Sequence, residues 1–198
     1  MSAFLFEHMN AVNSSKKVIL GFAGLISSGK GTVAAYLEEK YSASTYRFST
    51  MLRHLLDRIY VPQTRDNIIK ISEAIRTQFG EDIMAKTIAH DVDNDSSPII
   101  VVEGIRRLAD IEYLQKLPHF VLVEIFADPE VRYQRLIQRG ENADDQSKTF
   151  EQFLEDHKRS TELSILDVLP LAKERIDNNG TPEQLHEQLD ALIQKFTQ

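Results

Sequence analysis

One short segment, Gly24 to Thr32, restricts the fold of this chain more than any other. It reads Gly-Leu-Ile-Ser-Ser-Gly-Lys-Gly-Thr, follows the apolar run 18–23 and precedes a segment with helical periodicity. A tight loop between a strand and a helix turns successive backbone N–H groups toward one point, and glycine permits the bends. The free N–H groups at the start of the helix add to the same positive field. The segment therefore predicts a phosphate-binding P-loop.

The residues of this loop have separate predicted roles. Lys30 supplies a mobile positive charge for the β- and γ-phosphates of a nucleotide. The residue after the lysine is Gly31 where the general pattern has serine or threonine, and Thr32 follows one position later. Thr32 is therefore the candidate hydroxyl for contact with phosphate or metal. The predicted nucleotide-binding residues are Gly24, Ser27, Ser28, Gly29, Lys30, Gly31 and Thr32.

The rest of the chain predicts an α/β domain with a mainly parallel sheet. Strand-length apolar runs lie at 18–23, 43–48, 99–102, 121–126 and 175–177. Segments with helical spacing lie at 30–40, 51–60, 66–79, 108–117, 130–139, 149–172 and 182–196. Strands that alternate with helices in this way form a parallel sheet covered on both faces. We expect a three-layer P-loop NTPase fold with a five-stranded parallel sheet flanked by helices.

Two helical insertions interrupt the simple alternation. We expect residues 50–95 to hold an acceptor and residues 140–160 to form a lid, both within a single domain spanning 16–198. Residues 1–15 are expected to form an N-terminal tail. Asp128-Pro129 and Thr181-Pro182 each place a capping residue before proline, which predicts a helix start at both positions.

Composition excludes several functions. The net charge of −7 argues against a broad nucleic-acid-binding surface. The chain has no cysteine, so it has no disulfide, thiol nucleophile or thiolate metal site, which favours a cytoplasmic location. No apolar run approaches the ~18 residues that a membrane span needs. We therefore expect small-molecule ligands, no nucleic-acid or membrane partner, and a monomer or homodimer.

The third predicted strand ends in a carboxylate, followed by a glycine and two arginines. Glu103 at this position is a candidate to orient the water shell of a phosphate-bound magnesium ion. The alternative is that Glu103 pairs with Arg106 on the surface. Arg106 and Arg107 suit an acceptor phosphate, because the guanidinium fork matches phosphate oxygens. The predicted metal contacts are Glu103, through water, and Thr32.

Further arginines lie in two predicted helices. Ser49 or Thr50 is expected to cap the helix after the second strand, with Arg53 one turn inside it, facing either the cleft or solvent. A second group, Arg132, Arg135 and Arg139, shares one helical face. A basic stripe is usually a solvated face, but here it leads into a polar segment, so we interpret it as a lid clamp on triphosphate. Residues 157–159, His-Lys-Arg, are a further candidate source of positive charge.

On these motifs the chain resembles the nucleoside monophosphate kinases of the adenylate kinase type and the dephospho-CoA kinases. The loop ends in Gly-Lys-Gly-Thr, which is also the sequence at this position in adenylate and UMP/CMP kinases. The segment 103–107, Glu-Gly-Ile-Arg-Arg, matches their Asp-Gly-Phe-Pro-Arg, and 49–53, Ser-Thr-Met-Leu-Arg, matches Ser-Thr-Gly-Asp-Met-Leu-Arg with two residues missing. The lid entry 135–140 and the pair Asp144-Asp145 are also similar, although Arg159 would have to replace one family arginine.

Over residues 18–180 the chain also resembles an archaeal group of P-loop proteins labelled kinase-like. These share a strand-end Asp-Gly-Ile-Arg and a late Ala-x-x-x-Ile-x-Asn-x-Gly-(Ser/Thr), which matches Ala172 to Thr181. This second likeness covers most of the chain but implies no particular acceptor.

The adenylate kinase resemblance implies an ATP- and Mg²⁺-dependent transfer of the γ-phosphate to a small phosphorylated acceptor, above all a nucleoside monophosphate. It implies acceptor contacts from Arg53 and Arg107, whereas Arg106 stands where the family has proline and is an acceptor candidate only through its own guanidinium group. The expected catalytic residues are Lys30, Glu103, Arg107, Arg135 and Arg139. Two alternatives stay open: phosphorylation of a hydroxyl, as in dephospho-CoA kinases, and an ATP-hydrolysing switch that controls a protein partner.

Overall fold

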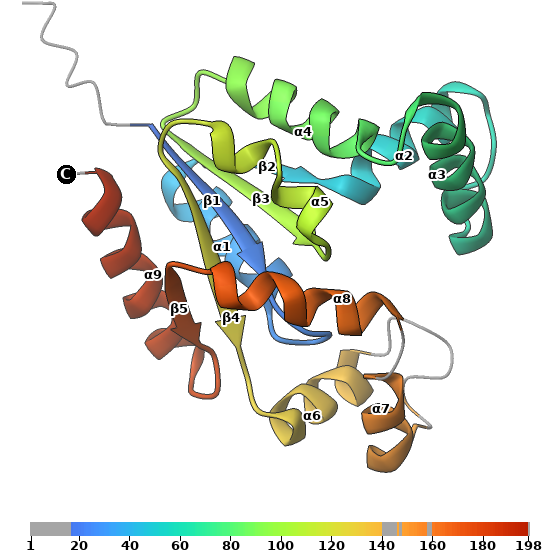
Figure 1. The fold of residues 1–198 in the computed structure, drawn as a ribbon. Helices are drawn as coiled ribbons and strands as arrows, with labels where there is room; N and C mark the ends of the chain where they lie inside the picture. The colour runs from blue at the N-terminus through green and yellow to red at the C-terminus, as the bar shows by residue number, and fades with distance from the viewer. Residues whose placement is uncertain (1–16, 140–145, 147, 158–159, 198) are drawn as a thin grey trace, which may run out of the picture.

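The computed structural model describes residues 17–139, 146, 148–157 and 160–197 (Figure 1). Its strands are β1 (Val18–Ala23), β2 (Ser44–Arg47), β3 (Ile99–Ile105), β4 (Phe120–Phe126) and β5 (Glu174–Asp177). They form one five-stranded sheet in the order β2-β3-β1-β4-β5, and every neighbouring pair is parallel. The expected parallel sheet is confirmed. Its central strand, β1, is the one that leads into the glycine-rich loop.

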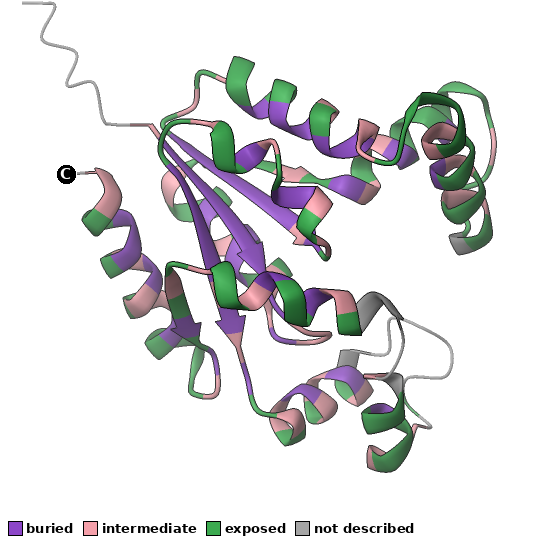
Figure 2. Ribbon diagram, viewed as in Figure 1, coloured by how far each residue is buried: buried purple, intermediate pink, exposed green. Residues whose placement is uncertain are grey.

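Helices cover both faces of this sheet. They are α1 (Lys30–Tyr41), α2 (Phe48–Arg58), α3 (Arg65–Phe79), α4 (Ile83–Asn94), α5 (Leu108–Ile111), α6 (Pro129–Arg139), α7 (Phe150–Asp156), α8 (Ser160–Val168) and α9 (Pro182–Thr197), with 3₁₀ turns η1 (Leu114–Lys116) and η3 (Leu169–Leu171). Figure 2 shows β1 and β3 buried along their length. One core cluster joins the sheet to α1 and α9, and the other joins it to α2, α4, α5 and η1. The architecture therefore has three layers.

Within the described residues, no helix is long and apolar enough to cross a membrane.

Local chemistry accounts for most helix boundaries. Helices α6 and α9 begin at Pro129 and Pro182, as predicted, since proline in the first turn loses no hydrogen bond. The hydroxyl of Thr181 accepts from the backbone N–H of Gln184 at 3.4 Å, which caps α9. Helix α3 is capped in the same way by Thr64, whose hydroxyl accepts from Asn67 N at 3.2 Å.

Two expected boundaries are wrong. Neither Ser49 nor Thr50 caps α2: the helix begins at Phe48, because β2 runs into it without a loop and Arg47 is the last extended residue. The single helix expected over 149–172 is divided into α7, α8 and η3. Pro170 lacks the N–H that would continue α8 beyond Val168.

The segment expected to be one helix over 108–117 is also divided, into α5 and η1. Pro118 follows, and it disfavours helical geometry at the preceding Leu117, which is extended with φ −75° and ψ 137°. Helix α4 lies inside the region expected to be helical over 50–95, although no separate boundaries were predicted for it.

The packing of α1 against the sheet gives a direct test of this core. Leu37 is fully buried in the α1–α9 cluster, so Leu37→Ala should lower the free energy of unfolding by about 2–5 kcal/mol in urea denaturation. The matched control is Leu166→Ala on α8, where the side chain is 49% exposed; it should change stability by less than about 0.5 kcal/mol. Equal losses for the two variants would contradict this assignment of the core.

Candidate functional site

Two positions of the loop, Gly24 and Gly29, must be glycine because other parts of the chain lie too close to them for a Cβ atom. A Cβ on Gly24 would lie 2.5 Å from the carbonyl oxygen of Ile125 and 2.6 Å from Ser28 Oγ. Gly29 has a φ of +101°, and a Cβ there would lie 2.1 Å from Asn178 Nδ2. The loop is therefore packed between the ends of β4 and β5, and both positions exclude any larger residue.

The Lys30 ammonium lies inside the curve of this loop. Its Nζ donates to the carbonyl oxygens of Gly24 at 2.6 Å and Leu25 at 3.1 Å, and lies 3.5 Å from Ser28 Oγ. These partners are neutral, whereas phosphate oxygens carry charge and form stronger hydrogen bonds with an ammonium group. The charge of Lys30 is thus already positioned where a phosphate on the loop would lie.

Ser27 adds a hydroxyl to the same loop. Its backbone has a φ of 59°, and its Oγ is buried without a hydrogen-bond partner in the described part of the chain. A buried hydroxyl of this kind costs free energy unless a ligand or water satisfies it. Gly31 and Thr32 begin α1 and are exposed.

The residue that positions this loop from outside is Asn178, which is not among the predicted site residues. Asn178 is 5% exposed, and its Nδ2 donates to the carbonyl oxygen of Ser28 at 2.8 Å. Its Oδ1 accepts from Arg135 Nη2 at 3.4 Å. Two sequence signals point to it: its place directly after a short strand, at an edge of the sheet where ligands gather, and its match to the asparagine of the motif over Ala172 to Thr181.

Arg135 and Arg132 both point inward from α6, so the expected basic stripe is not a solvated face. Burial lowers the pKa of the Arg135 guanidinium, and its Nη1 is buried without a hydrogen-bond partner among the described residues. Arg132, 3% exposed, donates from Nε to the carbonyl oxygen of Ala127 at 3.0 Å and from Nη1 to that of Ile26 at 3.3 Å. Arg132 therefore ties α6 to the loop, and Arg135 presents an available donor beside it.

The rest of the expected lid is described only in part. Arg132 Nη1 lies 2.7 Å from His157 Nε2, and His157 Nδ1 lies 2.8 Å from the carbonyl oxygen of Phe153. His157 therefore lies between Arg132 and the carbonyl oxygen of Phe153, and its expected contribution of positive charge stays a prediction. The side chain of Arg139 lies outside the described residues, as do Asp144, Asp145, Lys158 and Arg159.

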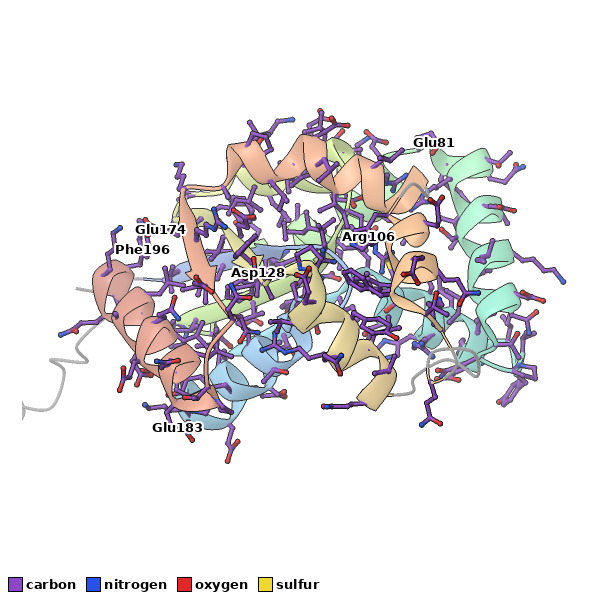
Figure 3. All side chains as sticks on the ribbon, turned by 90° about the horizontal axis from the view of Figure 1, so that it is seen from below. Glu81, Arg106, Asp128, Glu174, Glu183 and Phe196 are labelled. Atoms are coloured by element: carbon purple, nitrogen blue, oxygen red, sulfur yellow. The ribbon has the colours of Figure 1, made fainter. Side chains whose placement is uncertain are left out.

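Glu103 is paired, but not with the partner expected. Its carboxylate is 8% exposed and bonds through Oε1 to Arg47, the residue beside it on β2, from Nε at 2.8 Å and from Nη2. The expected alternative partner, Arg106, has an exposed side chain, and its backbone N–H donates to Asp110 Oδ2 at 2.9 Å. In the view of Figure 3, Arg106 lies right of the centre of the molecule, with Glu183 and Phe196 of α9 at the left.

A cleft of about 330 Å³ opens beside this pair and is lined in part by Gly31, Arg47, Thr50 and Glu103. The described residues contain no group of three or more His, Asp or Glu that would hold a metal ion unaided. One buried carboxylate near the loop nevertheless fits Mg²⁺, which usually takes one or two carboxylates and completes its shell with waters and substrate phosphates.

The predicted acceptor arginines Arg107 and Arg53 lie on different elements and have different hydrogen-bond partners. Arg107 Nη2 donates to Asp110 Oδ1 at 3.2 Å, next to the end of β3. Arg53 is exposed on α2, and its Nη1 donates to Gln63 Oε1 at 3.1 Å. Burial lowers the pKa of Arg76 on α3, and the positive charge of Arg107 lowers it further; Arg76 is not among the predicted site residues.

The contact between Gly29 and Asn178 yields a double-mutant test. Asn178→Ala leaves the buried Ser28 carbonyl without its donor and should cost about 1–3 kcal/mol in urea denaturation. Gly29→Ala should also destabilise the protein, but by at least about 0.5 kcal/mol less when Asn178 is already alanine, since the overlap with Nδ2 is then gone. Strictly additive costs would contradict this packing. Asn94→Ala, at an exposed asparagine of α4, is the control.

Solved structures of other proteins superimpose on this chain over most of its length. The crystal structure of TT1252 from Thermus thermophilus superimposes with a TM-score of 0.57 at 18% identity, covering 92% of this chain and 100% of that one. A shikimate kinase from Acinetobacter baumannii, solved with shikimate, gives a TM-score of 0.55 at 14% identity, covering 92% of this chain and 94% of that one. At these identities the likeness concerns the fold, which is the expected α/β P-loop kinase-like fold.

Sequence relatives span nearly the whole chain. A UPF0200 protein of Hyperthermus butylicus is 23% identical over 186 residues, which cover 94% of this chain and 98% of that protein. A UPF0200 protein of Methanocaldococcus jannaschii is 27% identical over 181 residues, covering 90% of each. The names of these relatives state no activity, so these matches do not single out the nucleoside monophosphate kinases or the dephospho-CoA kinases. A family model described as an AAA domain matches residues 23–152, and the chain belongs to that family.

Proposed function

We propose that this protein is an ATP- and Mg²⁺-dependent phosphotransferase that moves the γ-phosphate of ATP to a small phosphorylated acceptor, most suitably a nucleoside monophosphate. The observation that carries the proposal is the Lys30 ammonium held inside a strand–loop–helix turn. Ser27 Oγ in the same loop and Arg135 Nη1 on α6 are buried, and neither has a hydrogen-bond partner among the residues that the structure describes. A triphosphate would give both atoms a partner and would bring charged oxygens to Lys30.

The chain's own residues would act mainly by positioning and by charge, which carry most of the catalysis in phosphoryl transfer. Residues 24–32 would hold the β- and γ-phosphates through loop N–H groups and the Lys30 ammonium. Arg135 would reach the transferring group from α6, with Arg139 beside it. Because Asn178 holds both the Ser28 carbonyl and the Arg135 guanidinium, these groups would need little rearrangement on binding.

Magnesium would be held by the nucleotide phosphates and by waters that Glu103 orients, with Thr32 as a possible further contact. When bound, it would neutralise charge on the β- and γ-phosphates. Arg47 would keep the Glu103 carboxylate in place through Oε1. In the described part of the chain no hydrogen bond reaches its other oxygen, which suits contact with a water shell.

The acceptor would bind on the other side of the loop, against residues 50–95. Arg107 is the best-placed predicted contact, since it follows the end of β3, beside the strand that enters the loop. Arg53 and Arg106 are exposed at the same end of the sheet and would close on the acceptor phosphate. The single domain over 16–198, the lid at 140–160, the monomeric or homodimeric state and the cytoplasmic location stay predictions.

Replacing the loop lysine is the sharpest test of the donor site. Lys30→Ala should lower the rate of ATP-dependent phosphate transfer by about 10²-fold or more, because it removes the positive charge on the transferring group. Lys116→Ala, at an exposed lysine of η1, is the control and should retain the wild-type rate. A Lys30→Ala variant with the rate of the control would contradict the proposal.

An acceptor screen separates the proposal from its alternatives. ADP formation from ATP and Mg²⁺ would be measured with each nucleoside monophosphate, with dephospho-CoA, and with no acceptor. Stimulation by a monophosphate supports the proposed function, and removal of Mg²⁺ with EDTA should abolish it. Stimulation by dephospho-CoA alone would favour hydroxyl phosphorylation. ATP hydrolysis that no acceptor stimulates would favour a switch acting on a protein partner.

A further inference from the structure

The phosphate-binding loop contains one residue in a conformation that its side chain disfavours. Ser27 has a φ of 59°, in the left-handed region where a Cβ atom comes too close to the following carbonyl oxygen. Its Oγ is also buried without a hydrogen-bond partner among the residues that the structure describes. Strained backbone of this kind persists only where the surrounding structure holds it. The contacts on either side of Ser27 therefore determine whether the loop keeps its shape.

Two side chains from other elements hold the residues before and after Ser27. Arg132 on α6 donates from Nη1 to the carbonyl oxygen of Ile26 at 3.3 Å. Asn178, directly after β5, donates from Nδ2 to the carbonyl oxygen of Ser28 at 2.8 Å. The left-handed turn lies between these two hydrogen bonds. The loop is thus held in its strained shape from α6 on one side and from β5 on the other.

Arg132 also contacts α7, the helix that packs against α6 (Figure 1). Its Cζ lies 5.4 Å from the ring centroid of Phe153, a distance that suits a cation–π interaction. Its Nη1 lies 2.7 Å from Nε2 of His157, the C-cap residue of α7. Arg132 and Phe153 are both buried, so solvent screens their interaction little. One buried guanidinium therefore connects α7 to the carbonyl group of Ile26.

The geometry of this guanidinium makes the two contacts depend on each other. The group is planar and rigid, and its Nε donates to the carbonyl oxygen of Ala127 at 3.0 Å, which fixes it relative to the start of α6. The same nitrogen, Nη1, lies against both Ile26 and His157. A movement of α7 that displaces Nη1 therefore also changes its hydrogen bond to the loop.

We propose that Arg132 is a positioning residue that makes the phosphate-binding shape of the loop depend on the packing of α7. With α7 packed on Arg132, Nη1 holds Ile26 and keeps Ser27 in the left-handed region. Without this contact Ser27 relaxes, and the N–H groups of the loop no longer converge on a phosphate. The inference deepens the proposed function, because it concerns the regulation of the same loop and rests on nucleotide binding there. By linkage, a nucleotide on the loop must favour the packed α7.

Nucleotide affinity tests this dependence. In titration calorimetry with ADP and Mg²⁺, Arg132→Met should weaken binding by about 10-fold or more, and Arg132→Lys should weaken it less because a donor is kept. Phe153→Leu, on α7 and outside the loop, should weaken binding by about threefold, and by nothing further when Arg132 is already methionine. Leu154→Ala, at a 41% exposed position of the same helix, is the control and should bind ADP as wild type does.

Glycine at position 27 should remove the need for Arg132. Because Ser27→Gly permits the positive φ without a steric cost, Arg132→Met should lower ADP affinity by less than about threefold in a Ser27→Gly background. Ser42→Gly is the matched control, since Ser42 has a φ of 54° at the end of α1, outside the loop. It should leave the full effect of Arg132→Met. An arginine that only stabilises the fold would give the same loss of affinity in all three backgrounds, which would overturn the proposal.

Hydrogen exchange tests the connection without a ligand. Arg132→Met and Phe153→Leu should each speed exchange of the amides of residues 25–29 by about fivefold or more, whereas Leu154→Ala should not. If Arg132→Met does not fold, Arg132→Lys and Phe153→Leu supply the same comparison. Unchanged exchange in the folded variants would refute the role of Arg132. If wild-type protein binds no ADP, the proposed function fails, whereas the exchange measurement still decides whether Arg132 positions the loop.

Discussion

The shape of the phosphate-binding loop depends on one amide side chain that comes from the far end of the sequence. Asn178 fills the space beside Gly29 and donates to the carbonyl oxygen of Ser28, while its own backbone N–H donates to Phe126 at the end of β4. The loop is thus fixed by β4 and β5 as well as by the strand it follows. This explains why Gly24 and Gly29 tolerate no side chain.

The charges of the molecule are distributed to suit this loop. The chain as a whole carries a net charge of −7, yet Lys30 follows β1, Arg107 follows β3 and Arg135 contacts Asn178 directly after β5, so these three cations lie at the carboxyl edge of the sheet. Burial lowers the pKa of Arg76 and of Arg135, and each keeps a guanidinium nitrogen without a partner in the described residues. Burying a cation without a partner costs free energy. An anionic ligand bound at this edge of the sheet would offset that free energy. The negative net charge would disfavour the binding of polyanions on the rest of the surface.

Local sequence patterns predicted the parts of this structure that local chemistry determines. The strand–loop–helix around Lys30 and the helix starts at Pro129 and Pro182 depend on neighbouring residues and were predicted correctly. So were the apolar strands, because burial on both faces leaves a continuous apolar run. The break at Pro170 was missed although its cause is local, because proline lacks the N–H that would continue α8. The contact of Asn178 with Ser28 and the Arg47–Glu103 pair could not be predicted, because each joins segments that are distant in the sequence.

The central claim is that the loop over residues 24–32 binds the β- and γ-phosphates of a nucleotide through Lys30. Phosphorus NMR of ATP and Mg²⁺ titrated with the protein tests it most directly, because it observes the phosphates themselves. The account predicts that the β and γ resonances shift or broaden with wild-type protein and stay at their free positions with Lys30→Ala. Unchanged resonances with wild-type protein, or the same shifts with both proteins, would contradict it.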